Sequence, residues 1–342
     1  MKLGKSRIHL LILLFAVSSL LVHVPSDAYA AVDTWTAATT TNVGGTIMRG
    51  VSMSDASNGV AVGLSGEIVY TTNGGDTWTA ATTTNVGGNH IFGVSMSDAN
   101  NGVAVGAAGT IVYTTNGGDT WTAATTTNVG GTTMHGVSMS DASNGVAVGA
   151  AGQIVYTSDG GDTWTDATTT NVGGTTMRGV SMSDANNGVA VGSGGTIVYT
   201  SDGGDNWTAA TTTNVGITRI YGVSMSDANN GVAVGDSRTI VYTSDGGDTW
   251  TIPTTKNVGV HDVQGVSMSD ANNGVAVGSG GTIVYTSDGG DNWTAATTTN
   301  VGVLNMYAVS MSDANNGVAV GDSGQIVYTS DGGDTWTDAT TT

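Results

Sequence analysis

The sequence predicts an all-β fold, a seven-bladed β-propeller made of four-stranded antiparallel blades. Three observations predict it: a unit of 43 residues occurs seven times, each unit contains four short strand-like segments, and the composition disfavours helices. The 342 residues include 54 Gly, with β-branched Thr and Val in excess. There is no Cys, so we expect packing between sheets, without disulfides, to hold the fold together.

Charge and composition narrow the class of protein. The formal net charge is −19, yet only 10% of the residues are charged and 39% are hydrophobic. Such a chain carries enough apolar surface to fold, unlike a disordered acidic tail. Only 8 residues are Lys or Arg, which excludes general binding to a nucleic-acid backbone.

Residues 1–30 have the pattern of a secretory signal peptide. Three cations are followed by an apolar run and then by small residues at a cleavage position, namely Lys2, Lys5 and Arg7, Leu10 to Val24, and Ala28-Tyr29-Ala30. The apolar run is shorter than the roughly 20 residues that cross a bilayer, so we expect no membrane span. The sequence therefore predicts a secreted or extracytoplasmic protein (periplasm, lumen or extracellular) whose mature domain comprises residues 31–342.

The repeats follow one another without insertions. The string Val-Ser-Met-Ser-Asp begins at Val51, Val94, Val137, Val180, Val223, Val266 and Val309, always 43 residues apart. Residues 42–342 hold seven complete units, and a period of this length is typical of propeller blades or solenoid units. In the fourth unit the expected strands are Met177 to Met182, Val189 to Val191, Ile197 to Thr200 and Trp207 to Thr213.

A single four-stranded sheet with apolar residues on both faces needs a neighbour on each side. A ring supplies both neighbours, whereas an open solenoid would need polar terminal units, and none is visible in the sequence. The ring leaves one question open. Residues 33–41 are an eighth copy of the fourth strand, so either this extra outer strand or the terminal copy, residues 334–342, can close the ring.

Each unit also carries a Thr-x-Asp/Asn-x-Gly-x-Thr/Asn-Trp motif, illustrated by Thr157, Asp159, Gly161, Thr163 and Trp164. It resembles the Asp-box (BNR-type) motif of sialidases and related propellers, in which the Asp ties down the hairpin between strands three and four. The longer segment from Gly188 to Trp207 resembles the repeat of the photosystem II assembly and stability factor family. That resemblance implies a seven-bladed ring and, as one functional alternative, a role in photosystem assembly.

Most differences between the seven units fall in two short windows at one edge of the blades. The first window connects strand four to strand one of the next unit. Its last position reads Arg49, Phe92, His135, Arg178, Tyr221, Gln264 and Tyr307, and two residues earlier it reads Ile47, His90, Thr133, Thr176, Arg219, Asp262 and Asn305. The second window is the turn between strands two and three. Both windows should surround one mouth of the channel.

Aromatic faces and directed hydrogen-bond donors are typical of ligand-binding sites. We therefore predict a ligand-binding mouth formed by Arg49, Phe92, His135, Arg178, Arg219, Tyr221, Asp262, Gln264 and Tyr307. The alternative interpretation is that exposed loops vary simply because little constrains them.

Catalytic and metal chemistry is not indicated. A glycosidase needs two carboxyl groups facing each other across the scissile bond, and only Asp262 lies deep in the first window. The histidines are scattered over several blades, which does not suit a metal ion. We expect no catalytic residue, metal or cofactor.

These observations predict a secreted, non-catalytic binding module that holds a glycan or an extracellular protein or peptide at the variable mouth. The alternative is a protein like the photosystem II assembly and stability factors, and the third hypothesis is a sialidase-like glycoside hydrolase. The sequence does not indicate the oligomeric state.

Overall fold

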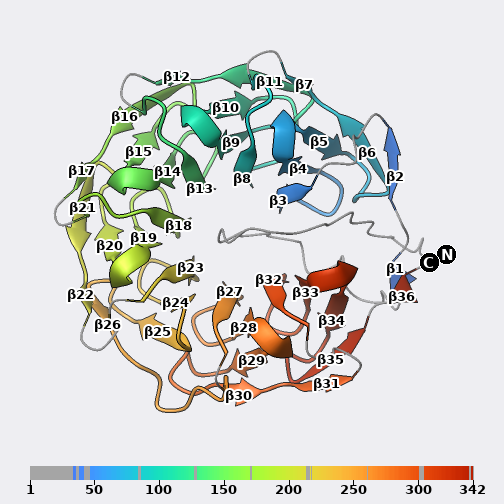
Figure 1. The fold of residues 1–342 in the computed structure, drawn as a ribbon, viewed down its shortest axis with the longest axis vertical. Coiled ribbons are helices and arrows are strands. Elements are labelled where there is room, and N and C mark those ends of the chain that lie inside the picture. The colour runs from blue at the N-terminus through green and yellow to red at the C-terminus, as the bar shows by residue number, and fades with distance from the viewer. Residues whose placement is uncertain are drawn as a thin grey trace.

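The computed structural model shows a ring of sheets around a central axis (Figure 1). It describes residues 34–35, 38–41, 47–83, 86–126, 129–169, 172–212, 216, 218–259, 261–299, 304–338 and 340–341. Each 43-residue unit supplies four antiparallel strands that run in order from the channel to the outer rim. The predicted seven-bladed β-propeller is confirmed.

The seven blades are numbered in chain order. Their four strands are β3 (Met48–Met53), β4 (Gly59–Gly63), β5 (Ile68–Thr71) and β6 (Thr77–Ala80); β8 (Ile91–Met96), β9 (Gly102–Gly106), β10 (Ile111–Thr114) and β11 (Thr120–Ala123); β13 (Met134–Met139), β14 (Gly145–Gly149), β15 (Ile154–Thr157) and β16 (Thr163–Asp166); β18 (Met177–Met182), β19 (Gly188–Gly192), β20 (Ile197–Thr200) and β21 (Asn206–Ala209); β23 (Ile220–Met225), β24 (Gly231–Gly235), β25 (Thr239–Thr243) and β26 (Thr249–Trp250); β27 (Val263–Met268), β28 (Gly274–Gly278), β29 (Ile283–Thr286) and β30 (Thr294–Ala295); and β32 (Met306–Met311), β33 (Gly317–Gly321), β34 (Ile326–Thr329) and β35 (Thr335–Asp338).

Most blades also have a fifth, outermost strand that the preceding unit contributes, which the sequence did not predict. After strand four the chain crosses to the next blade and pairs in parallel with that blade's own strand four, as Thr168 and Thr169 do with Asn206 and Trp207. These outer strands are β2 (Thr39–Thr41), β7 (Thr82–Thr83), β12 (Thr125–Thr126), β17 (Thr168–Thr169), β22 (Thr211–Thr212) and β31 (Thr297–Thr299). In blade 6 the equivalent pairing is a single bridge between Thr255 and Asn292.

The extra copy of strand four, residues 33–41, and the terminal copy, residues 334–342, both take part where the ring closes. Residues 39–41 form the outer strand of blade 1. Just before them, β1 (Thr34–Trp35) pairs in parallel with β36 (Thr340–Thr341), with Thr34 opposite Thr340. Figure 1 shows this pair at the outer rim, between blade 1 and blade 7. The two ends of the repeat array therefore meet directly.

The Asp box ties down its hairpin as its resemblance implied. In blade 3, the Asp159 Oδ1 atom accepts hydrogen bonds from the Thr157 hydroxyl (2.9 Å) and from the Thr163 N–H (2.9 Å). In blade 1, Asn73 Oδ1 accepts the equivalent Thr77 N–H at 3.0 Å. The amide oxygen of Asn thus accepts the same hydrogen bond as the carboxylate oxygen of Asp, so units with Asn form the same turn.

The core lies between blades. In the junction between blades 2 and 3, Val103, Val105 and Ile111 of one blade pack against Val155 and Trp164 of the next. Among the described residues there are six such clusters, one for each junction from blades 1 and 2 to blades 6 and 7. The Trp Nε1 atom donates a hydrogen bond to a Gly carbonyl of its own box, 3.0 Å away for Trp164 and Gly161.

Polar contacts strengthen these six junctions at their inner and outer ends. Near the channel, the Met182 N–H of blade 4 donates to the Ser138 Oγ atom of blade 3 at 3.1 Å. At the rim, the Tyr156 hydroxyl of blade 3 donates to Asp205 Oδ1 of blade 4, also at 3.1 Å. The second Asp of each Asp-Gly-Gly-Asp step is therefore a partner for the preceding blade.

We expect Trp164→Ala to lower the free energy of unfolding by about 3–5 kcal/mol, because it leaves a cavity between two blades. Chemical denaturation followed by circular dichroism measures this. Ile252→Ala is the matched control, since Ile252 is 37% exposed, and it should change the free energy by no more than about 0.5 kcal/mol. Equal effects of the two substitutions would contradict a core located between blades.

Candidate functional site

Seven of the nine residues predicted to line the mouth are β-bulge residues. In blade 4, Met177 pairs with Gly192 and Gly179 pairs with Val191, so Arg178 is an extra residue with no opposite partner. The innermost strand of every blade has the same irregularity at the equivalent position. A bulge breaks the strand alternation and redirects the side chain. This backbone feature explains how the seven positions can vary without disturbing the packed faces.

The bulges of neighbouring blades approach each other closely. A Cβ atom built on Gly136 would lie 3.2 Å from the Arg178 carbonyl oxygen of the next blade, and one on Gly93 would lie 3.3 Å from the His135 carbonyl oxygen. Consecutive innermost strands contact one another from β3 to β32. The glycine after the bulge thus lets adjacent strands come together at the mouth. Blade 7 has Ala308 in place of this glycine.

Blades 1 to 4 bring cationic and aromatic side chains to the mouth. The Phe92 ring makes an edge contact with His90, with ring centroids 6.3 Å apart, and a tilted contact with His135 at 6.0 Å. The Arg178 Nε atom donates to Ser193 Oγ at 3.2 Å. The Arg49 Nε atom is buried and has no hydrogen-bond partner among the described residues. This side of the mouth therefore retains donor capacity for a ligand.

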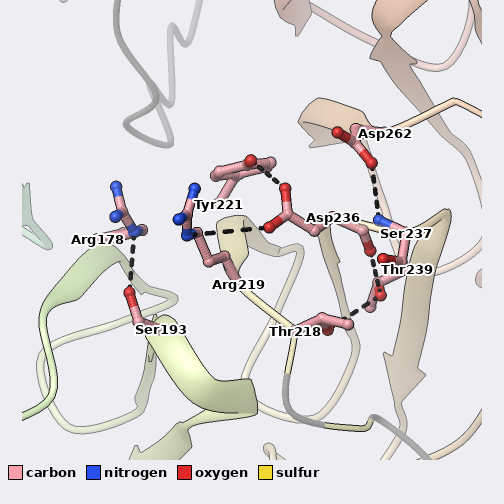
Figure 2. A network of polar contacts seen from close by, with 9 residues as sticks. All are labelled: Arg178, Ser193, Thr218, Arg219, Tyr221, Asp236, Ser237, Thr239 and Asp262. Carbon is pink, nitrogen blue, oxygen red and sulfur yellow. Dashed lines mark hydrogen bonds and ion pairs between the residues drawn. The ribbon is translucent and has the colours of Figure 1, made fainter.

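Blades 5 and 7 place tyrosines against carboxylates. The Tyr221 hydroxyl donates to Asp236 Oδ1, and the Arg219 Nε atom lies 4.0 Å from Asp236 Oδ2 (Figure 2). The Tyr307 hydroxyl donates to Asp322 Oδ1 at 2.7 Å. Burial and the neighbouring Asp236 raise the pKa of Tyr221 to about 12. The hydroxyl therefore stays protonated and oriented at neutral pH.

The position two residues before the bulge forms contacts between blades. Ser65 N–H donates to His90 Nδ1 at 3.0 Å, and Ser237 N–H donates to Asp262 Oδ1 at 2.7 Å (Figure 2). In blade 7, Asn305 Oδ1 accepts the Gly280 N–H at 3.0 Å. Each of these side chains holds the strand two to three turn of the preceding blade. Asp262, predicted as a ligand contact, has this structural contact as well.

The nine predicted site residues lie in equivalent places around the ring. Seven are the bulge residues, and Arg219 and Asp262 come just before the bulges of blades 5 and 6. The sequence analysis did not predict that Asp236 and Asp322 accept hydrogen bonds from Tyr221 and Tyr307. The signal was present, because both units with Tyr at the bulge position also have Asp 15 residues later. The turn between strands two and three is thus part of the mouth.

Below the mouth, the channel is narrow and lined by the Val-Ser pairs of the innermost strands. The lining comes from blades 2 to 6: Val94, Ser95, Val137, Ser138, Val180, Ser181, Val223, Ser224, Val266 and Ser267. The serine oxygens accept hydrogen bonds from the next blade, as Ser181 Oγ does from Met225 N–H at 3.1 Å. The channel wall consequently contributes to blade packing more than to ligand binding.

The described residues contain neither a cluster of metal-binding side chains nor a membrane-spanning helix. No group of three or more His, Asp or Glu side chains there is arranged to hold a metal ion. None of the helical turns in those residues is long and apolar enough to cross a membrane.

The repeats match a known family. The family model described as "Photosynthesis system II assembly factor YCF48" matches residues 128–214 and 211–300, which together make up just over half of the chain. The chain belongs to this family. The resemblance drawn from the Asp-box repeats is confirmed. None of the curated proteins matches the chain.

Solved structures agree with the fold. YCF48 bound to D1 peptide is 18% identical with a TM-score of 0.65, and the match covers 83% of this chain and 93% of that chain. YCF48 from Cyanidioschyzon merolae is 19% identical with a TM-score of 0.64, covering 84% and 95%. The U3-55K structure reaches 0.64 at 8% identity, covering 81% and 89%. At these identities the likeness shows a shared propeller fold.

We expect stability to fall from pH 7 towards pH 5 partly because of His135. Burial, and secondarily the Arg178 charge, lower the pKa of His135 below its usual value of 6.5. The unfolded chain therefore binds a proton more readily than the folded chain, and stability is lost as the pH falls through the folded-state pKa. Denaturant unfolding at several pH values should show a smaller loss for His135→Asn. An unchanged pH profile in that variant would contradict the lowered pKa.

Proposed function

We propose that this chain is a YCF48-like, non-catalytic assembly factor that holds an extended peptide segment of a partner protein at the mouth formed by the bulges. The observation that carries the proposal is the mouth itself, where seven blades each present one redirected side chain. The family relationship supports it, and so does the structure of YCF48 bound to D1 peptide. By this analogy the partner is a photosystem subunit.

The chemistry of the mouth suits a peptide. Arginine and aromatic residues are enriched in protein interfaces, because they combine large contact area with directed hydrogen bonds. Among the described residues, Arg49 Nε lacks a hydrogen-bond partner, and Arg178 uses only its Nε atom, on Ser193. These donors can bind peptide carbonyl or carboxylate oxygens. The narrow channel below keeps a ligand on the mouth.

The same geometry supports a non-catalytic role and a peptide over a glycan. The mouth carboxylates already accept hydrogen bonds: Asp236 from Tyr221, Asp262 from Ser237 N–H, and Asp322 from Tyr307. A hydrolase would need one carboxyl group as a proton donor and another as a base or nucleophile. In the similar structure of YCF48 bound to D1 peptide, the bound molecule is a peptide.

We also propose that the protein acts outside the cytoplasm after export. The signal pattern of residues 1–30 lies outside the described residues, so this proposal rests on the sequence alone. The domain has no Cys, so its fold does not depend on the redox state of the compartment and is compatible with export.

Peptide binding can be tested with an array of overlapping peptides covering the D1 protein. We expect the double variant Phe92→Ala/Arg178→Gln to bind the selected peptide about tenfold more weakly or worse, because it removes an aromatic contact and a cation. Fluorescence anisotropy with the labelled peptide measures the affinity.

The control for this experiment lies on the opposite edge of the blades. Thr115 is exposed beside the Asp box of blade 2, and Thr115→Ala should bind like the unaltered protein. Equal affinity of the double variant and the control would place the peptide elsewhere and overturn the proposed site. Turnover of a sialoside by the purified protein would overturn the non-catalytic role.

Export predicts a defined mature N-terminus. When the full chain is produced in a cell with a secretory pathway, the protein recovered from the extracytoplasmic fraction should begin at Ala31. N-terminal sequencing together with intact mass measures this. Protein that accumulates in the cytoplasm and retains residues 1–30 would contradict export.

A further inference from the structure

We infer a second binding site, for a phosphate group, in a surface pocket between the strand two to three turn of blade 5 and the loop that leads to blade 6. The pocket has a volume of about 430 Å³ and is lined by Ser237, Arg238 and residues 256–259. It shares no residue with the nine predicted for the mouth. Two observations carry the inference: a strained arginine and a lysine placed beside it.

Arg238 occupies a backbone conformation that the other units reserve for glycine. The six equivalent residues are Gly66, Gly109, Gly152, Gly195, Gly281 and Gly324. Arg238 has a φ of +65°, close to the +73° of Gly109. A side chain with a Cβ atom is strained in this left-handed region, and at this position of the turn blade 5 alone carries one, since the other six units have glycine. Backbone geometry therefore favours glycine at this position and does not account for the arginine of blade 5.

The arginine side chain also explains why a pocket exists at this junction. In blades 2 and 3 a Cβ atom on Gly109 or Gly152 would lie 2.1 Å from the carbonyl oxygen of Gly130 or Gly173, which is too close to be accommodated. The matching carbonyl in blade 6 is that of Gly259. It accepts a hydrogen bond from Arg238 Nη1 at 3.2 Å, so the loop is held away from the turn by the length of the side chain.

The second cation is specific to the same junction. Lys256 stands where the other copies of the motif have Thr. Its Nζ atom donates to the Arg238 carbonyl oxygen at 3.3 Å. Burial, and secondarily the Arg238 charge, lower the pKa of Lys256. The fold therefore holds two positive charges side by side. Their electrostatic repulsion destabilises the folded state, and a bound anion would remove it.

The neighbouring carboxylates do not neutralise this pair. Asp236 faces Arg219 and Tyr221, and Asp262 accepts the Ser237 N–H. Figure 2 shows both carboxylates engaged with these groups. Within the described residues, no ion pair joins Arg238 or Lys256 to an acid. What sets this place apart in a chain with a net charge of −19 is that two cations lie next to each other, with neither paired to a carboxylate among the described residues.

Two adjacent cations favour a dianion over a carboxylate, because each charge adds its own attraction and charge-assisted hydrogen bonds. A phosphate group fits this requirement. The pocket volume lies in the range of small-molecule sites, so it also has room for the organic part of a phosphate monoester.

Isothermal titration calorimetry with inorganic phosphate, glucose 6-phosphate and acetate tests the site. The variants are Arg238→Gly and Lys256→Thr, which restore the residues found in the other units and should fold normally. We expect each to weaken phosphate binding about tenfold or more, and the double variant to abolish it. Arg238→Gly should also raise the unfolding temperature by about 2–4 °C, because it relieves the strained backbone.

The outcomes separate cleanly. Tighter binding of glucose 6-phosphate than of inorganic phosphate would identify an organic ester as the ligand, and equal binding would identify the free ion; both support the site if the double variant loses them. Absence of phosphate binding, equal affinity in the double variant, or acetate binding as tight as phosphate would overturn the inference.

Discussion

The packing of each blade against the next is the interaction on which the whole structure depends. A single 43-residue unit has apolar residues on both faces of its sheet and cannot bury either alone. The valines of one blade are covered by the Trp and Val of the following blade. A serine hydroxyl near the channel and a tyrosine hydroxyl at the rim fix the same junction from both ends. Stability is therefore a property of pairs of blades.

The same junctions build the mouth. Glycine after each bulge permits the innermost strands to approach, and the bulge residue is then directed away from the packed faces. Because the bulge residue takes no part in packing, the seven units can carry five different residue types at this one position. Where a single unit departs further from the others, as at Arg238 and Lys256, the junction itself changes shape and a pocket opens.

Much of the fold could be predicted from the sequence, because a repeat of constant length shows the same pattern of strands in all seven units. The bulge could not, since Met177, Arg178 and Gly179 read as a regular strand with alternating burial. The parallel outer strand was also missed. Its threonines were assigned to strand four, and only the three-dimensional ring shows that they cross to the next blade.

The candidate site was predicted in part. Variation between units located the seven bulge positions, but it gave no partners for them. Asp236 and Asp322 became interpretable only when the turn was seen beside Tyr221 and Tyr307. The sequence likewise gave no role to the second Asp of the Asp-Gly-Gly-Asp step, whereas in the structure Asp205 accepts a hydrogen bond from Tyr156 of the preceding blade.

Closure of the ring by its two ends is the central claim, and a disulfide tests it most directly. The chain has no Cys, so the double variant Thr34→Cys/Thr340→Cys has a single possible internal disulfide between the paired strands β1 and β36. Paired strands lie at a separation that a disulfide can span. We predict that the purified monomer forms this bond on oxidation, seen by mass spectrometry of its peptides. Free thiols after oxidation, or disulfides formed only between molecules, would contradict a ring closed in this way.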